Sequence, residues 1–115
     1  MPLVEITYAP HVPHSVLKEL AAMLPHAVSV AVECPEEPYD GDLQPGDVEL
    51  RFRPRGPFDV SGMDIVVEVR SKWFESRAAN RQHRVDNLCK AVADSTNVAE
   101  VGVYLSLPIA AWAQS

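Results

Sequence analysis

Apolar residues that alternate with polar ones mark separate segments of this 115-residue chain, with helical patterns between them. Over 3–8 the alternation places Val4, Ile6 and Tyr8 on one side of an extended chain, which predicts a strand. The same two-residue period predicts further strands over 27–33, 47–53, 63–70 and 98–107. So regular an interleaving of strand and helix patterns predicts helices packed against a sheet.

Two helices are predicted. In the first, over 14–24, apolar residues recur at helical spacing, and Pro25 is expected to end it. The second runs over 74–94 and carries a solvated outer face, formed by Arg77, Arg81 and Arg84. The segment 34–46 is acidic and rich in proline and glycine, which predicts a loop.

The element order is therefore β-α-β, an extra strand, and β-α-β. We predict one α+β domain over 1–115, made of two fused β-α-β units at about 2–34 and 62–107. A loop and strand over 35–61 would be inserted between the units. The strands would form a mixed four- to five-stranded sheet with both helices on one face. The other face would stay open, which favours self-association.

The charge balance bears on partners. Ten Lys and Arg residues against 16 Asp and Glu give a net charge of −6, which argues against a nucleic-acid or anionic-membrane partner. A ferredoxin-like RNA-binding domain would fit the element order. It would need exposed aromatic residues on its strands, whereas the strand over 47–53 offers only the inward-facing Phe52. No apolar run approaches the roughly 18 residues of a membrane span, and no signal segment is apparent, so a cytoplasmic protein is expected.

Metal or disulfide chemistry is not indicated. Cys34 and Cys89 are 55 positions apart and form no CxxC motif. His11 and His14 have the spacing of a metal pair, but no third ligand is apparent. We expect neither a metal nor a cofactor.

Pro2 is the candidate catalytic residue. Proline is small enough for Met1 to be removed ahead of it, which would leave a free secondary amine at the start of a strand. The reference α-amino pKa is about 7.7–8.0, and an apolar pocket or a nearby cation would lower it. Such an amine is suited to removing a proton next to a carbonyl at neutral pH.

A chain of this length and element order that begins Met-Pro-apolar resembles the tautomerase superfamily. The passage RSKWFESR, over 70–77, lies between a predicted strand and a helix and is similar to the basic junction of the family's isomerase branch. The resemblance implies a homotrimer that acts on a small keto-enol carboxylate, with Pro2 as the general base.

The resemblance also implies substrate-binding residues. Lys72, or Arg70 beside it, would hold the substrate carboxylate. The family often takes a second cation from the first half of the chain, but no arginine lies near the first helix here. The first half offers Lys18 on the first helix and Arg51, Arg53 and Arg55 on or after the strand over 47–53, and of these Arg51 is taken as a candidate substrate-binding residue. Tyr104, on the last strand, would line a neighbouring subunit's pocket.

A second hypothesis is a non-catalytic trimeric binding or scaffold protein on the same fold. The missing arginine near the first helix and the extra strand favour it. Retention of Met1 would also favour it, because the nitrogen of Pro2 would then be an amide.

Overall fold

The first strand of the chain lies in the interior of the sheet. In the computed structural model, which describes residues 1–115, β1 (Leu3–Tyr8) pairs in parallel with β2 (Glu49–Pro54). On its other side β1 pairs antiparallel with β3 (Ile65–Arg70). Because β3 pairs in parallel with β4 (Val101–Ser106), the sheet is mixed and four-stranded, in the order β2-β1-β3-β4.

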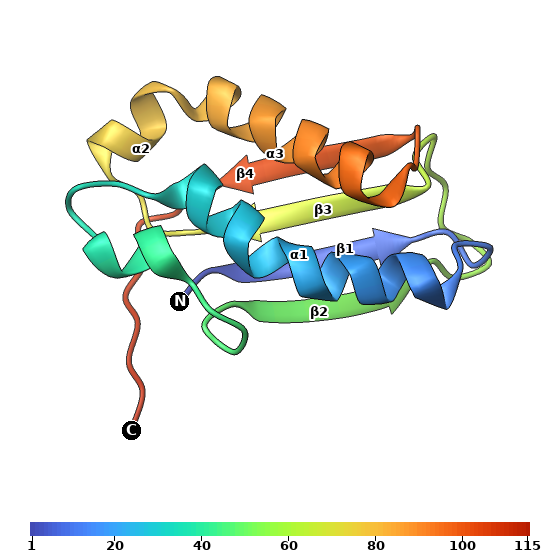
Figure 1. Ribbon diagram of the computed structural model, residues 1–115, viewed down its shortest axis with the longest axis horizontal. Coiled ribbons are helices and arrows are strands. Elements are labelled where there is room, and N and C mark those ends of the chain that lie inside the picture. Colours follow the sequence, from blue (N-terminus) through green and yellow to red (C-terminus); the bar gives the residue numbers. More distant parts are fainter.

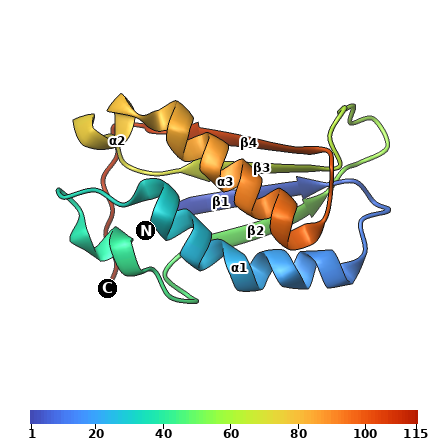
Figure 2. The same cartoon turned by 45° about the horizontal axis from the view of Figure 1, so that its top comes forward.

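Helices join the strands of each parallel pair. The connection from β1 to β2 holds α1 (His14–Val32) and a 3₁₀ helix, η1 (Pro38–Asp42). The connection from β3 to β4 holds the short α2 (Glu75–Ala79) and α3 (Arg81–Thr96). Figures 1 and 2 show the helices against one face of the sheet. The predicted fold class, an α+β fold of two β-α-β units with helices on one face, is confirmed.

The core lies between the sheet and the helices. Alternate residues of the two central strands are fully buried on that side: Val4, Ile6, Ile65, Val67 and Val69. The helices contribute their apolar stripes, including Leu20, Leu24, Val28, Leu88 and Val92. Each side chain of this size stabilises the fold by about 1.5–3 kcal/mol when it leaves water. This layer fixes which residues of each strand face away from the helices.

The predicted end of the first helix is wrong. Pro25 lies inside α1, which continues to Val32, so the expected strand over 27–33 does not exist. Pro25 donates no hydrogen bond to the preceding turn, but Ala21 is exposed, so its carbonyl can be solvated. The continuous α1 is also long and apolar enough to cross a membrane, by length and composition alone. Its apolar residues instead include much of the core, among them Leu20, Leu24 and Val28.

The strand predicted over 47–53 is β2, and it is the parallel partner of β1. It therefore completes the first β-α-β unit, with the loop and η1 leading into it. The second helix is also divided, because α2 ends at Ala79 and α3 begins at Arg81. The central antiparallel pair of β1 and β3 thus joins two units of the same build.

The sheet face opposite the helices is open and charged. Across its middle, the register aligns Arg51 of β2, Glu5 of β1, Glu68 of β3 and Tyr104 of β4. Arg53 lies 3.8 Å from Glu5, in an ion pair that is largely exposed. Within one chain, no helix covers this face of the mixed sheet.

Candidate active site at the N-terminal edge

The antiparallel pairing of β1 and β3 brings the N-terminus to the basic junction after β3. Leu3 is the register partner of Arg70, so Pro2 and Met1 continue alongside Ser71 and Lys72. On the other side, the carbonyl of Pro2 accepts a hydrogen bond of 3.0 Å from the backbone N–H of Glu49. Pro2 is buried and held between two strands. Three predicted site residues, Pro2, Arg70 and Lys72, are therefore near one another in the fold.

A cavity of about 160 Å³ lies at this edge. Strand β1 and the basic junction contribute Met1, Leu3, Arg70, Ser71 and Lys72. The C-terminal segment contributes the apolar remainder of the wall: Pro108, Ala110, Ala111 and Trp112. Pro2 itself does not line the cavity. Its nitrogen carries Met1, which does, so that nitrogen lies at the cavity margin.

The apolar wall is anchored by the backbone. The N–H of Trp73 donates a hydrogen bond of 2.9 Å to the carbonyl of Pro108, which turns the C-terminal segment across the end of β3. From there the segment runs past the N-terminal edge of the sheet (Figure 1). Trp112 remains about half exposed. Ligand pockets usually measure about 300–1,000 Å³, so this cavity suits a small molecule.

Both side-chain cations of the cavity already have carboxylate partners. The Lys72 ammonium lies 3.2 Å from the Glu37 carboxylate, and about a third of each side chain is exposed. The Arg70 guanidinium lies 3.4 Å from Glu68, in a more exposed pair. A carboxylate ligand must therefore compete with an internal carboxylate at either cation.

The acidic segment over 33–47 packs against the basic junction. Next to Glu37, the carboxylate of Glu36 accepts a hydrogen bond of 2.7 Å from the hydroxyl of Ser76, and this bond lowers the pKa of Glu36 below its usual value. At the far end of the segment, Asp47 accepts hydrogen bonds from Tyr39 and from the backbone of Gln44. The backbone bond is the larger cause of the lowered pKa of Asp47, and the Asp47 contact raises the pKa of Tyr39. The segment is thus an ordered part of the site's surroundings.

Arg77 joins this segment to the junction, and its predicted solvent exposure is wrong. The side chain is fully buried and forms an ion pair of 2.9 Å with Asp40. It also donates to the hydroxyl of Ser71 and the carbonyl of Lys72, both at 2.8 Å, and to the carbonyl of Val32 at 2.6 Å. The interruption of the helix between α2 and α3 explains the difference, because Arg77 does not share a helix with Arg81 and Arg84.

Arg51 and Tyr104 lie elsewhere. Both are on the open face of the sheet, in one cross-strand row, with β1 and β3 between them. At about 4.8 Å per strand, their backbones are roughly 14 Å apart. Arg51 is exposed and lies 3.7 Å from Glu49, and Tyr104 is 71% exposed. Neither lines the cavity of its own chain.

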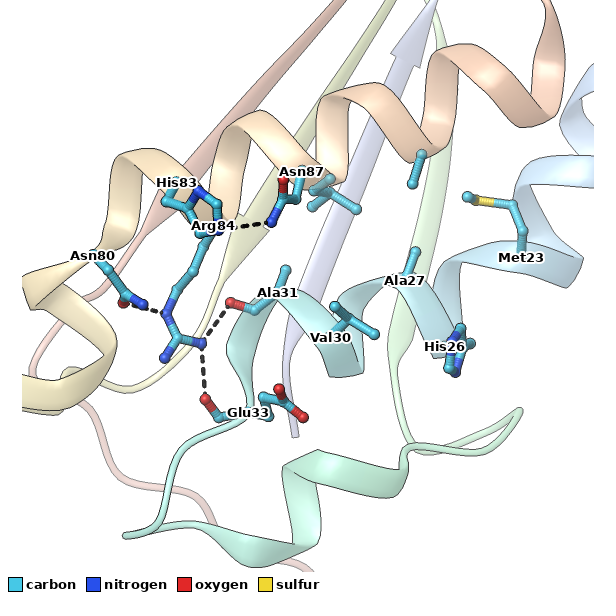
Figure 3. A pocket seen from close by; sticks show the side chains of 12 residues that line it. Met23, His26, Ala27, Val30, Ala31, Glu33, Asn80, His83, Arg84 and Asn87 are labelled. Atoms are coloured by element: carbon cyan, nitrogen blue, oxygen red, sulfur yellow. Dashed lines mark hydrogen bonds between the residues drawn. The ribbon is translucent and has the colours of Figure 1, made fainter.

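A larger hollow of about 520 Å³ lies between residues of α1 and α3, two helices that pack against each other (Figure 3). Its base includes small or apolar side chains, among them Ala27, Ala31 and Leu88. Its one arginine, Arg84, donates to the carbonyls of Ala31 and Glu33 at 3.0 and 2.8 Å and to Asn80 at 2.7 Å. These bonds satisfy the carbonyls at the end of α1, so Arg84 has a structural role. We therefore place the candidate active site at the smaller N-terminal cavity.

No group of three or more His, Cys, Asp or Glu side chains is placed to hold a metal ion. An amine at Pro2 could accept a proton, and Lys72 or Arg70 could hold a carboxylate and stabilise negative charge that develops beside it.

No protein-family model matches this sequence, and no curated protein matches it. Many solved structures nevertheless share its fold. A malonate semialdehyde decarboxylase is 15% identical with a TM-score of 0.68, over 98% of this chain and 90% of that one. A macrophage migration inhibitory factor-like protein from Entamoeba histolytica is 11% identical with a TM-score of 0.60, over 94% and 89% of the two chains. The wild-type symmetric trimer of a fused 4-OT is 15% identical with a TM-score of 0.60, over 93% and 85%.

These neighbours have the tautomerase-superfamily fold, so the fold resemblance expected from the sequence is confirmed. Identities of 11–15% show the fold alone, since one fold can carry many activities. The chemistry of this chain must be argued from its own site.

Proposed function

We propose that this protein is a tautomerase or isomerase of a small keto-enol carboxylate, with Pro2 as its general base once Met1 has been removed. The observation that carries the proposal is the register of β1 with β3, which brings the N-terminus to Arg70 and Lys72 beside a cavity. The secondary amine of Pro2 takes the proton of an enol hydroxyl or of a carbon next to a carbonyl. The resulting ammonium returns a proton to another carbon, so the base is regenerated.

Lys72 binds the substrate carboxylate in this proposal, and Arg70 supplies a second positive charge at the cavity wall. Both favour the enolate-like charge that develops during proton transfer. The apolar wall formed by Pro108, Ala110 and Trp112 contacts the remainder of the substrate. No metal or cofactor takes part, and the reaction takes place in the cytoplasm.

Self-association belongs to the same proposal. The open sheet face is the surface that another copy would cover, and a trimer would be consistent with the fused 4-OT neighbour. Arg51 and Tyr104 lie on this face. Any contact that they make with a substrate is therefore in a neighbouring subunit's site.

The experiment compares ketonisation of phenylenolpyruvate, which carries one carboxylate, by two forms of the protein. Mass spectrometry first establishes that Met1 is absent from the wild type. In the second form a lysine is inserted between Met1 and Pro2, so that the methionine is retained and the nitrogen of Pro2 is an amide. Because general-base catalysis typically contributes about 10²–10⁴-fold, we expect a loss of rate in that range.

Pro57→Ala is the matched control, because Pro57 is an exposed proline in the loop after β2. It should keep the wild-type rate. Equal rates for the wild type and the insertion variant would reject Pro2 as the base. Absence of ketonisation above the uncatalysed rate in both forms would favour the second hypothesis, a non-catalytic binding or scaffold protein.

A further inference from the structure

We propose that Glu37 is a specificity-determining residue, which limits the N-terminal cavity to ligands that carry one carboxylate near Lys72. The inference rests on the proposed function for the location of the substrate, and it adds the substrate's charge class. It follows from which charges meet at the cavity and from how firmly Glu37 is held there.

The side-chain charges at the cavity balance once the carboxylates paired with its two cations are counted, although neither carboxylate lines it. Lys72 and Arg70 contribute two positive charges, and their partners Glu37 and Glu68 contribute two negative ones. A ligand with one carboxylate can exchange with Glu37 at the Lys72 ammonium. A second carboxylate nearby would face the displaced Glu37. The Pro2 amine is unprotonated when it acts as the proposed base, so no uncommitted cation in this chain's cavity wall offsets the repulsion.

Glu37 is not free to move far from Lys72. Three residues further on, Asp40 is 4% exposed and forms its ion pair with the fully buried Arg77. On the other side, Glu36 accepts the hydrogen bond from Ser76. The N–H of Leu43 also donates a hydrogen bond of 2.6 Å to the buried hydroxyl of Ser29, so η1 is held to α1.

Arg77 also fixes the backbone at Lys72, the other member of the ion pair. Arg77 donates to the carbonyl of Lys72 as well as to Asp40, so one guanidinium sets the backbone positions on both sides of the Lys72–Glu37 pair. Removing one member of such a buried pair leaves an uncompensated charge and is strongly destabilising. The backbone positions of Lys72 and Glu37 relative to each other are therefore set by the fold.

The test compares a matched pair of ligands, butyrate and succinate, which differ only in the second carboxylate. Binding is followed by the amide chemical shifts of Ser71 and Ala110, which line the cavity. The proteins are the wild type and the Glu37→Gln variant, at one ionic strength. Removing one unit charge a few ångströms from the second carboxylate should raise the succinate-to-butyrate affinity ratio by about tenfold.

Two variants serve as controls. Glu36→Gln changes the net charge of the same segment equally, but Glu36 contacts Ser76 and not Lys72. It should shift the ratio by less than about twofold, since exposed charges are screened over short distances. Glu37→Asp keeps the charge and should keep the wild-type preference for butyrate.

An unchanged ratio in Glu37→Gln would overturn the inference, as would an equal change in Glu36→Gln. Absence of binding of either ligand by both the wild type and Glu37→Gln would overturn the cavity as the site. Because binding is measured without turnover, the two proposals can fail separately. A shifted ratio in a protein that catalyses no ketonisation would support the charge selectivity and reject the proposed reaction.

Discussion

Arg77 has no solvent contact, and each of its three guanidinium nitrogens donates to a different part of the chain. Its spacing from Arg81 and Arg84 predicts a solvated stripe, because sequence spacing assumes one continuous helix. The break at Asn80 removes that assumption. The partners of Arg77 include Val32 and Asp40, which lie 45 and 37 positions away. Nothing in the local pattern around Arg77 could have indicated them.

The Lys72–Glu37 pair was inaccessible to sequence reasoning for the same reason, since its members lie 35 positions apart. Lys72 and Arg70 could be singled out because they follow a strand and precede a helix, where anion-binding residues are frequent. Their association with Pro2 depends on the antiparallel register of β1 and β3. That register is a property of the whole sheet.

At the scale of single residues, we predict that Arg77→Leu lowers the free energy of unfolding by about 3–5 kcal/mol, because Asp40 is left buried without its cation. Adding Asp40→Asn to Arg77→Leu should restore part of the loss, since the pair is coupled by about 0.5–3 kcal/mol. Urea denaturation of the two single variants and the double variant measures both quantities.

Arg81→Leu is the comparison variant. Arg81 is exposed and bonds only the carbonyl of Ala78, so its effect should stay within about 0.5 kcal/mol. If Arg77→Leu had an equally small effect, the buried ion pair would not hold the loop as described.

Among the elements, the sequence was sufficient to predict the four strands of the sheet, but it did not predict where α1 ends. Val28, Val30 and Val32 alternate with other residues, a pattern that predicts a strand, and Pro25 favours the end of a helix. The structure instead buries Ala27, Val28, Ala31 and Val32, a spacing that also fits a helix. Packing of this helical face against the sheet outweighs the cost of the proline. A short apolar run does not distinguish the two outcomes by itself.

The end of α3 provides a prediction at the element scale. Asn97 follows the helix in a left-handed conformation, with φ of 58°, and its N–H donates a hydrogen bond of 2.9 Å to the carbonyl of Ala93. Asn97→Ala should cost about 1–2 kcal/mol of stability, because a Cβ without a compensating polar group disfavours this conformation. Asn97→Gly should be at least as stable as the wild type.

Thermal and urea unfolding of both variants would measure this difference. A destabilised Asn97→Gly with an unaffected Asn97→Ala would contradict the assignment of the left-handed helix end. Asn97 is exposed, so loss of core packing does not complicate the comparison.

Considered as a whole molecule, the protein has helices on one side of its sheet and charged side chains on the other. Sequence patterns were enough to predict one open face, because two helical segments can cover only one side of such a sheet. They did not reveal that the ion pairs on this face, such as Arg53 with Glu5, are weak and solvent-exposed. These pairs are available to exchange partners when a second copy approaches.

We therefore expect native mass spectrometry to detect an oligomer, with the trimer as the main species. Tyr104→Ala should weaken the assembly by about tenfold or more, since an exposed tyrosine on an interface is a frequent source of binding energy. Val30→Ala, on the helical side, is the control and should leave the assembly unchanged. A monomeric wild type at micromolar concentration would contradict the expectation.

The central place of β1 also determines the order of events while the chain is being made. β1 is made before both of its neighbours, since β2 is complete at Pro54 and β3 only at Arg70. Until β3 forms, β1 can pair only with β2, so the segment ahead of β1 has no strand on its other side. Once β1 is inserted, Pro2 is buried and its carbonyl is bonded to Glu49. The surroundings of Pro2 are thus completed only after the first 70 residues of this sequence have been made.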